Sequence, residues 1–193
     1  MSELLLSARG LTKTYVMGKR SLEVLRGVDV DIARGDFLAL RGASGAGKST
    51  LLHLIGGLDT PNAGEIIFNG QSFADFSESK LTDFRNRRVG FIFQAYHLLP
   101  ELTALENVCL PARIARIAVA TAKQRATELL TRVGLKDRLD HKSSELSGGE
   151  IMELLQSLRT EKQTTLVIAT HDAKVAALAP RVIELVDGLI ATA

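Results

Sequence analysis

Between residues 37 and 57, a short apolar run leads directly into a glycine-rich loop and then into a helical segment that Gly56 and Gly57 are expected to end. The loop and the residues that follow it are Gly42, Ala43, Ser44, Gly45, Ala46, Gly47, Lys48, Ser49 and Thr50. This order matches the phosphate-binding pattern G-x-x-x-x-G-K-[ST] in its required strand–loop–helix context. Glycine takes unusual φ values freely, so backbone N–H groups can turn inward around phosphate oxygens. The segment predicts an α/β fold with a nucleotide site.

The residue types of the loop also predict how the phosphates are held. Lys48 is expected to reach the β- and γ-phosphates, and the Ser49 hydroxyl is expected to bind Mg²⁺. The positive end of the following helix adds to the attraction for an anion. The alternative is a glycine-rich turn with an incidental lysine, which the flanking strand and helix disfavour. We therefore assign ATP binding to residues 42–50, with Mg²⁺ as the cofactor.

The rest of the chain predicts strands at both ends and helices between them. Before residue 70, short apolar runs are separated by glycines at positions 10, 27 and 35, and Asn69-Gly70 predicts a turn. From about 101 to 146 the period is helical; Thr121 and Gln124 predict a capping box, and Gly134 predicts a helix end. Strands return at 165–169 and 181–186, with Asp187-Gly188 as a hairpin turn. The pattern predicts one α/β domain with a helical lobe inserted in its second half.

Composition limits the partners and the compartment. The chain has 193 residues, with 24 Lys and Arg against 22 Asp and Glu, so net charge gives no reason to expect a nucleic-acid partner. One cysteine excludes an internal disulfide and fits a reducing compartment. No apolar run approaches the roughly 18 residues of a membrane span, and the first residues are not typical of a signal peptide. A cytosolic chain is expected, with any membrane role depending on a partner.

A second constellation lies far downstream of the loop. It consists of Leu146, Ser147, Gly148, Gly149 and Glu150. One interpretation is a capped helix start, with a serine N-cap and a glutamate three residues later. The other is an anion site formed by the serine hydroxyl and the two glycine amides. The two interpretations are compatible, because a helix N-terminus attracts anions.

Together, these two motifs resemble the nucleotide-binding subunit of an ATP-binding cassette (ABC) transporter. The resemblance implies a P-loop NTPase sheet of the RecA-like type, an N-terminal antiparallel β subdomain and an inserted helical subdomain, with the core at 1–93 and 164–193 and the helices at 95–150. It implies that Tyr15 stacks on adenine, that Gln94 contacts Mg²⁺ and the attacking water, and that His171 contacts the γ-phosphate. Gln94 and His171 are thus the candidate catalytic residues of an ATPase.

Residues 54–59 and 93–108 are similar to the lipoprotein-release and macrolide-export group of that family. The group implies a membrane permease as partner, a place on the inner face of the cytoplasmic membrane, and export or lipoprotein release as the work driven by ATP. It also implies a head-to-tail dimer, in which Ser147 and Gly149 of one copy close over ATP bound at Lys48 of the other. The apolar segment 96–100 is expected to line the groove for the permease, or else to pack between the lobes.

The sequence departs from the family at one place. The family needs an apolar strand ending in Asp-Glu before the histidine, and no Asp-Glu dipeptide occurs in this chain. Glu150 is followed at once by Ile151 and a helical stripe, which indicates an internal deletion and one missing core strand between the Gln94 and His171 strands. This leaves a second hypothesis, a nucleotide-binding remnant that does not hydrolyse ATP. A chromosome- or repair-type relative is disfavoured, because no long coiled-coil insertion follows Gln94.

Overall fold

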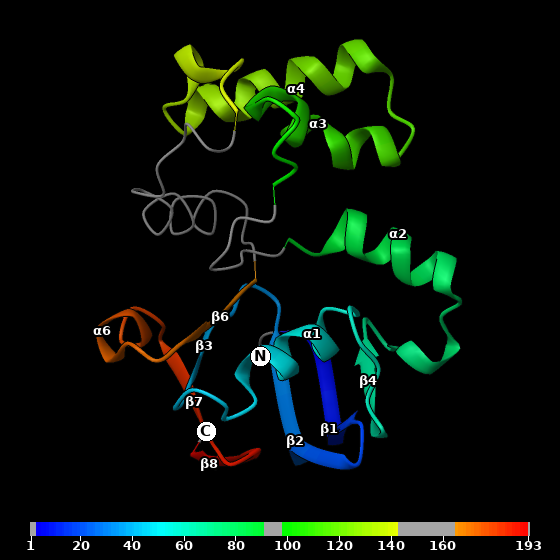
Figure 1. Ribbon diagram of the computed structural model, residues 1–193, viewed down its shortest axis with the longest axis vertical. Helices are drawn as coiled ribbons and strands as arrows, with labels where there is room; N and C mark the ends of the chain where they lie inside the picture. Colours follow the sequence, from blue (N-terminus) through cyan, green and yellow to red (C-terminus); the bar gives the residue numbers. More distant parts are fainter. Residues whose placement is uncertain (1–2, 91–97, 143–164, 193) are drawn as a thin grey trace. The chain divides into compact units, whose positions relative to one another are not determined.

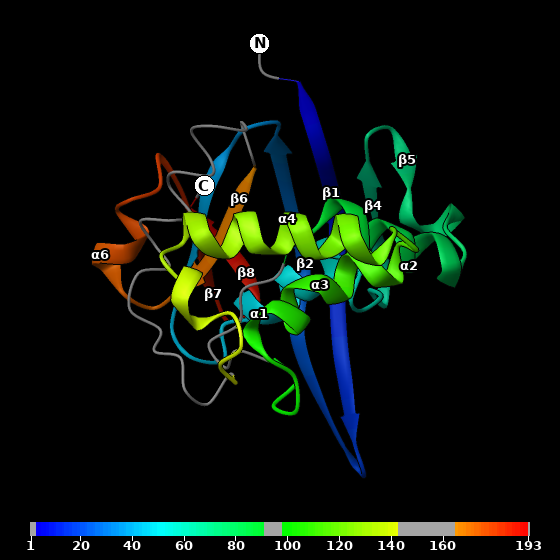
Figure 2. The same cartoon turned by 90° about the horizontal axis from the view of Figure 1, so that it is seen from above.

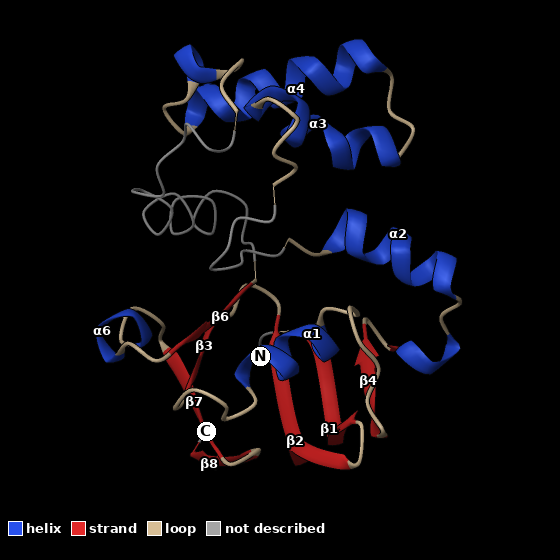
Figure 3. Ribbon diagram, viewed as in Figure 1, coloured by secondary structure: helices blue, strands red, loops and turns tan. Residues whose placement is uncertain are grey.

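The computed structural model describes residues 3–90, 98–142 and 165–192 (Figure 1). The described residues fall into two compact units, one built from 3–81 with 165–192 and the other from 82–90 with 98–142. Figure 3 shows the described strands in the first unit and helices α3 and α4 in the second. Within these three ranges, no helix is long and apolar enough to cross a membrane.

An antiparallel sheet of order β2-β1-β4-β5 forms one half of the first unit. Its strands are β1 (Leu4–Met17), β2 (Arg20–Ala33), β4 (Ala63–Phe68) and β5 (Gln71–Ser72). Figure 2 shows β1 and β2 as a long hairpin whose turn extends past the ends of the other strands. The expected breaks at Gly10 and Gly27 are wrong, since both strands continue through them. The pairing shifts register around both glycines, which have positive φ values of 59° and 102°, so they form bulges rather than strand ends.

The second sheet has the order β6-β3-β7-β8 and carries the phosphate-binding motif at one end. Strand β3 (Phe37–Arg41) lies parallel to both β6 (Leu166–Thr170) and β7 (Arg181–Val186), and β8 (Leu189–Thr192) returns antiparallel to β7. Asp187 and Gly188 join β7 to β8 with φ values of 47° and 79°, and Asn69 and Gly70 join β4 to β5 with 49° and 74°. Two successive positive φ values are typical of the tight turns predicted at both places.

One hydrophobic core joins the two sheets through helix α1 (Lys48–Ile55). Leu51 and Leu54 of the helix are fully buried in that core, together with Leu11 and Leu25 from the antiparallel sheet and Leu185 from the parallel sheet. The helix ends at Gly56, as predicted. Because α1 contributes to both layers, its N-terminus is fixed relative to β3 as well as to β1.

Strand β6 has the sequence of an interior strand but not its burial. Its residues Leu166 to Ala169 are continuously apolar, as is typical of a parallel strand covered on both faces. Every residue of β6 is nevertheless only half-buried, whereas Phe37 to Leu40 of the neighbouring β3 are all buried. Among the described residues, β6 pairs with β3 alone. This asymmetry is what the loss of the next strand in the sheet would produce.

From residue 98 on, the second unit is built around a helical pair. Helices α3 (Ala104–Ile114) and α4 (Val119–Arg132) pack through a small core that includes Leu105, Cys109 and Leu130, and the short helix η2 (Lys136–Arg138) follows. The capping box expected at Thr121 and Gln124 is wrong, because α4 already begins at Val119. Gly134 does follow the helix end, with a φ of 76°.

Helix α2 (Glu78–Arg88) and the capping box of α3 were not predicted from the sequence. α2 buries only one side chain, Phe84, so no apolar stripe in the sequence indicates this helix. The capping box is formed by Thr103 and Glu106: the Thr103 hydroxyl accepts from the Glu106 N–H at 3.2 Å, and the Glu106 carboxylate accepts from the Thr103 N–H at 2.9 Å. The remaining short helices are η1 (Phe73–Asp75) and α6 (Ala173–Ala176).

We expect Thr103→Ala to lower the free energy of unfolding of the helical unit by about 1 kcal/mol, because the first turn of α3 loses its cap. Urea denaturation followed by circular dichroism would measure the change. Thr121→Ala is the matched control, since Thr121 lies inside α4, and should change stability by no more than about 0.5 kcal/mol. A larger loss from Thr121→Ala than from Thr103→Ala would contradict this assignment of the cap.

Candidate nucleotide-binding site

The glycine loop lies at the carboxyl ends of the parallel strands. β3 ends at Arg41, the loop occupies residues 42–47, and α1 begins at Lys48. In open α/β sheets this edge is where ligands bind. Ser44, Gly45 and Ser49 are exposed there, while Ala46 and Gly47 are buried against the body of the unit. The tip of the predicted phosphate-binding loop is therefore accessible to a ligand, while the end of the loop that joins α1 is packed against the rest of the unit.

Two glycines of the loop are required by close backbone approaches. A Cβ at Gly42 would collide with the carbonyl oxygen of Leu185, and a Cβ at Gly47 would lie 2.7 Å from Leu25 Cδ2. Gly47 also has a φ of 100°, which side-chain-bearing residues rarely adopt. The loop is thus held between β2 and β7, and its curl depends on the absence of side chains at these two positions.

The Lys48 ammonium is folded back into the loop. It donates to the carbonyl oxygens of Gly42 at 2.8 Å and Ala43 at 2.7 Å. Neither acceptor is charged, so phosphate oxygens can compete for the same donors with stronger charge-assisted bonds. In this position the Lys48 ammonium lies beside the backbone of the loop, where it would contact an anion bound by the loop amides.

The N-terminus of α1 is open to an anion. Its N-cap is Gly47, and among the described residues no side chain caps it and no acidic residue lies in its first turn. The first N–H groups of a helix have no partner within the helix, and the helix dipole is positive at this end. A phosphate group would satisfy both the free N–H groups and the local charge.

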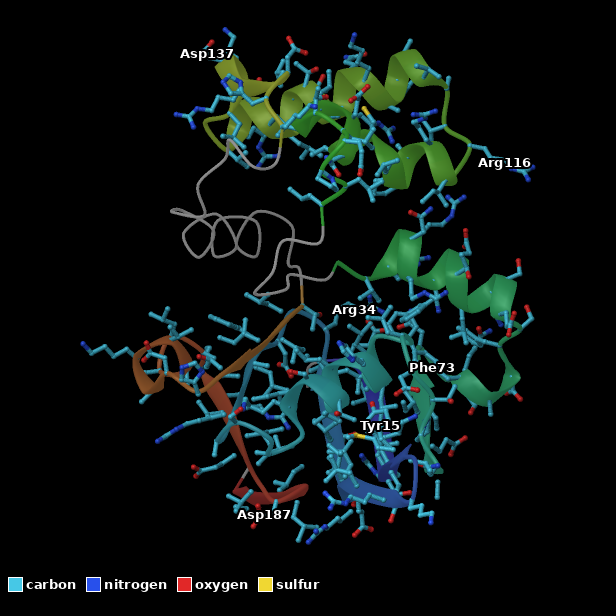
Figure 4. All side chains as sticks on the ribbon, viewed as in Figure 1. Tyr15, Arg34, Phe73, Arg116, Asp137 and Asp187 are labelled. Atoms are coloured by element: carbon cyan, nitrogen blue, oxygen red, sulfur yellow. The ribbon has the colours of Figure 1, made fainter. Side chains whose placement is uncertain are left out.

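A pocket of about 230 Å³ adjoins the loop. It is lined by Gly42, Ala43, Ser44 and Ala46 on one side and by residues 184–187 at the end of β7 on the other. Figure 4 labels Asp187 at the turn between β7 and β8. The pocket therefore lies between the glycine loop and the end of β7.

His171 lies at the same sheet edge as the loop. Arg41 of β3 pairs with Thr170 of β6, so Gly42 and His171 each follow directly after paired residues of adjacent parallel strands. The His171 side chain is exposed. The next residue, Asp172, caps α6 by accepting from the Lys174 N–H at 2.7 Å. The structure thus places the predicted histidine at the same sheet edge as the predicted loop, and Asp172 caps the helix that follows.

Tyr15, which is labelled in Figure 4, lies half-buried on β1 and is bound to the segment that follows α1. Its hydroxyl donates to Asp59 Oδ2 at 2.9 Å, and the Thr50 side chain lies beside it. Asp59 Oδ1 in turn accepts from Lys13 Nζ at 2.7 Å, and Lys13 also donates to the Thr60 carbonyl at 2.7 Å. Sequence reasoning missed Lys13 and Asp59, because a residue two positions before a tyrosine and another 44 positions after it give no local signal.

The environment shifts two pKa values in this group. Burial raises the pKa of the Tyr15 hydroxyl, and its bond to the Asp59 carboxylate raises it further. Burial alone would raise the pKa of Asp59, but the hydrogen bonds from Lys13, Tyr15 and the Thr60 N–H together hold it below its ordinary value of 3.8. The lowered pKa keeps Asp59 a carboxylate at neutral pH.

We expect acid to weaken the first unit through Asp59. Since its pKa is lower in the folded chain than in the unfolded chain, it stabilises the fold above about pH 4, and this contribution is lost as the pH falls through the folded pKa. The free energy of unfolding, measured with urea between pH 7 and pH 3, should fall less steeply for Asp59→Asn than for the wild type. Equal slopes for the two proteins would contradict the assignment.

The other predicted site residues lie outside the described residues. These residues are Gln94 and the segment 146–150. For Mg²⁺, the described residues offer the Ser49 hydroxyl at the first turn of α1, and among them no group of three or more His, Cys, Asp or Glu could hold a metal. Such a site fits a metal that arrives with the phosphates, which supply most of its oxygen ligands.

Comparisons with a family profile and with known proteins both point to ABC transporter ATP-binding proteins over most of the chain. The family profile described as "ABC transporter" matches residues 25–167. The lipoprotein-releasing system ATP-binding protein LolD of Syntrophotalea carbinolica is 42% identical over 219 residues, covering 96% of each chain. The protein of the same name from Myxococcus xanthus is 40% identical over 222 residues, covering 98% of this chain and 99% of the relative.

A solved structure extends the likeness to three dimensions. The dimeric post-hydrolysis state of the ATP-binding cassette MJ0796 bound to ADP and Pi has a TM-score of 0.88, with 33% identity and 97% of both chains covered. The alignments with the two LolD proteins run over more positions than this chain has residues, so those relatives carry residues that this chain lacks. That difference agrees with the internal deletion inferred from the sequence.

Proposed function

Because this chain belongs to the ABC transporter family of ATPases, as an ATP-binding subunit of the LolD type, we propose that it binds MgATP and uses it to drive a membrane permease in export or lipoprotein release. The observation that supports the proposal best is the loop at residues 42–47, whose open helix start and inward-turned Lys48 are suited to a triphosphate. The likeness to a cassette bound to ADP and Pi supports the same choice of ligand.

The residues of the site divide the work. The amides of residues 42–50 and the Lys48 ammonium bind the phosphates, and the Tyr15 ring stacks on adenine. Ser49 and Gln94 hold Mg²⁺, which neutralises phosphate charge when it is bound. His171, at the carboxyl end of β6, lies at the sheet edge where a γ-phosphate held by the loop would be contacted. In this assignment, cationic and N–H groups lie beside the phosphates and an aromatic ring lies beside the adenine.

The mechanical part of the proposal concerns partners. Two copies would face each other head to tail, so that Leu146 to Glu150 of one copy close over the nucleotide of the other. The dimeric cassettes among similar solved structures support this arrangement. ATP binding drives closure and hydrolysis resets it, and the permease follows the movement through residues 94–100. The chain would then work on the inner face of the cytoplasmic membrane.

The absent Asp-Glu pair favours one competing function, a nucleotide-binding protein that does not hydrolyse ATP. None of the comparisons favours this alternative. The two are separated by a malachite-green phosphate assay on the purified 193-residue chain, alone and with its co-purifying permease. Phosphate release well above the background of a Lys48→Ala control supports the ATPase, whereas tight ATP binding without release supports the alternative.

A further inference from the structure

Lys13, Tyr15 and Asp59 form a connected group that the nucleotide-binding motifs do not include. Lys13 and Tyr15 are two residues apart on β1, so their side chains share a face of the strand. Asp59 comes from the segment directly after α1. Its carboxylate receives the ammonium on one oxygen and the phenol on the other, at 2.7 Å and 2.9 Å. The Lys13 ammonium also lies 5.1 Å from the centre of the Tyr15 ring.

The group is partly shielded from water, so solvent screens its ion pair and hydrogen bonds less than it screens those of exposed side chains. The Lys13 side chain is 11% exposed and that of Asp59 is 29% exposed. This differs from the other described ion pair of β1, between Arg9 and Asp31, whose side chains are 51% and 45% exposed. Exposed pairs contribute little because solvent screens them and the side chains remain mobile. The Lys13–Asp59 pair is thus the more rigid of the two.

The group also connects the tyrosine to the helix that begins at the phosphate loop. Asp59 is anchored to the last turn of α1, where the N–H groups of Leu58 and Asp59 both reach the His53 carbonyl, at 2.8 Å and 3.3 Å. At the other end of α1, the Thr50 side chain, which belongs to the loop motif itself, lies beside the same phenol and opposes the rise of its pKa. The Tyr15 hydroxyl is therefore bound by Asp59 after the end of α1 and lies beside Thr50 in its first turn.

We propose that Lys13 and Asp59 are positioning residues that hold the Tyr15 ring at a fixed place relative to the phosphate loop, so that the ring receives the adenine of a nucleotide whose phosphates the loop has bound. This rests on the proposed function, which assigns adenine stacking to Tyr15. A ring held in advance pays less conformational entropy on binding than a free one, so the gain is confined to ligands that carry a base.

The test compares ATP with inorganic triphosphate, which has the phosphates but no base. Wild type, Tyr15→Phe, Asp59→Asn, Tyr15→Leu and the control Asp31→Asn are titrated with each ligand in the presence of Mg²⁺ by isothermal calorimetry. Tyr15→Phe keeps the ring and removes only the hydroxyl tether, so it does not disturb the Lys13–Asp59 pair. It keeps the proposal testable even if Asp59→Asn, which leaves Lys13 without its partner, does not fold.

We expect Tyr15→Leu to weaken ATP binding about tenfold, and Tyr15→Phe and Asp59→Asn to weaken it about threefold to fivefold, the range of one lost hydrogen bond. Triphosphate affinity should stay the same in all of them, and Asp31→Asn should bind both ligands as the wild type does. A second readout uses the absence of tryptophan: in a Tyr96→Phe background Tyr15 is the one tyrosine, and ATP but not triphosphate should change its fluorescence.

The other outcomes separate the inference from the proposed function. If Tyr15→Leu weakens ATP binding while Tyr15→Phe and Asp59→Asn bind ATP as the wild type does, the positioning role is wrong and adenine stacking stands. Equal losses for ATP and triphosphate in Tyr15→Phe or Asp59→Asn would show a purely structural role and overturn the inference. Unchanged ATP affinity in Tyr15→Leu overturns adenine stacking and the positioning role together.

Discussion

Replacement of Lys48 by alanine should weaken ATP binding by about a hundredfold or more, the range expected when one partner of a desolvated charge pair is removed. Lys48 supplies the one ammonium that the described residues place inside the loop, and its present acceptors are two neutral carbonyls. A triphosphate replaces those acceptors with charged oxygens, so the interaction is gained almost entirely on binding. Calorimetry with ATP and Mg²⁺ measures the loss directly.

Lys123→Ala is the matched control for that experiment, because it removes the same charge from an exposed position on α4. It should leave the affinity for ATP unchanged. Circular dichroism and thermal melting of Lys48→Ala check that the fold is kept, which is expected since the side chain contributes little to the core. Unchanged ATP affinity in folded Lys48→Ala protein would refute the phosphate role of the loop.

The parts of the fold that the sequence predicts well are those set by local backbone chemistry. Asn69-Gly70 and Asp187-Gly188 form tight turns because each pair accepts two positive φ values. α1 ends at the glycine pair Gly56-Gly57, of which Gly57 has a positive φ of 70°. By contrast, the sequence predicts breaks at Gly10 and Gly27, but both strands continue through them as bulges. Whether a glycine breaks a strand depends on its neighbours in the sheet, and these are far away in the sequence.

The site shows the same division between local and long-range information. The loop at 42–50 is recognisable because its function needs consecutive residues of fixed type. The Lys13–Asp59 pair joins positions 46 residues apart, and neither residue has a distinctive local pattern. The box predicted at Thr121 and Gln124 is wrong because α4 already begins at Val119, while the similar pair Thr103 and Glu106 forms the box at the start of α3.

The deletion itself predicts an uneven core, which two substitutions in neighbouring strands can measure. Leu40 on β3 is fully buried, so Leu40→Ala should lower the free energy of unfolding by about 3–5 kcal/mol through lost burial and the cavity left behind. Ile168 on β6 is apolar and pairs with Ala39 of the same β3, but it is only half-buried. Ile168→Ala should therefore cost about half as much or less. Urea denaturation of the wild type and the two variants gives both losses of stability under one condition.

A loss for Ile168→Ala equal to that for Leu40→Ala would mean that β6 is packed like an interior strand. That result would contradict the interpretation that the next strand of this sheet has been deleted.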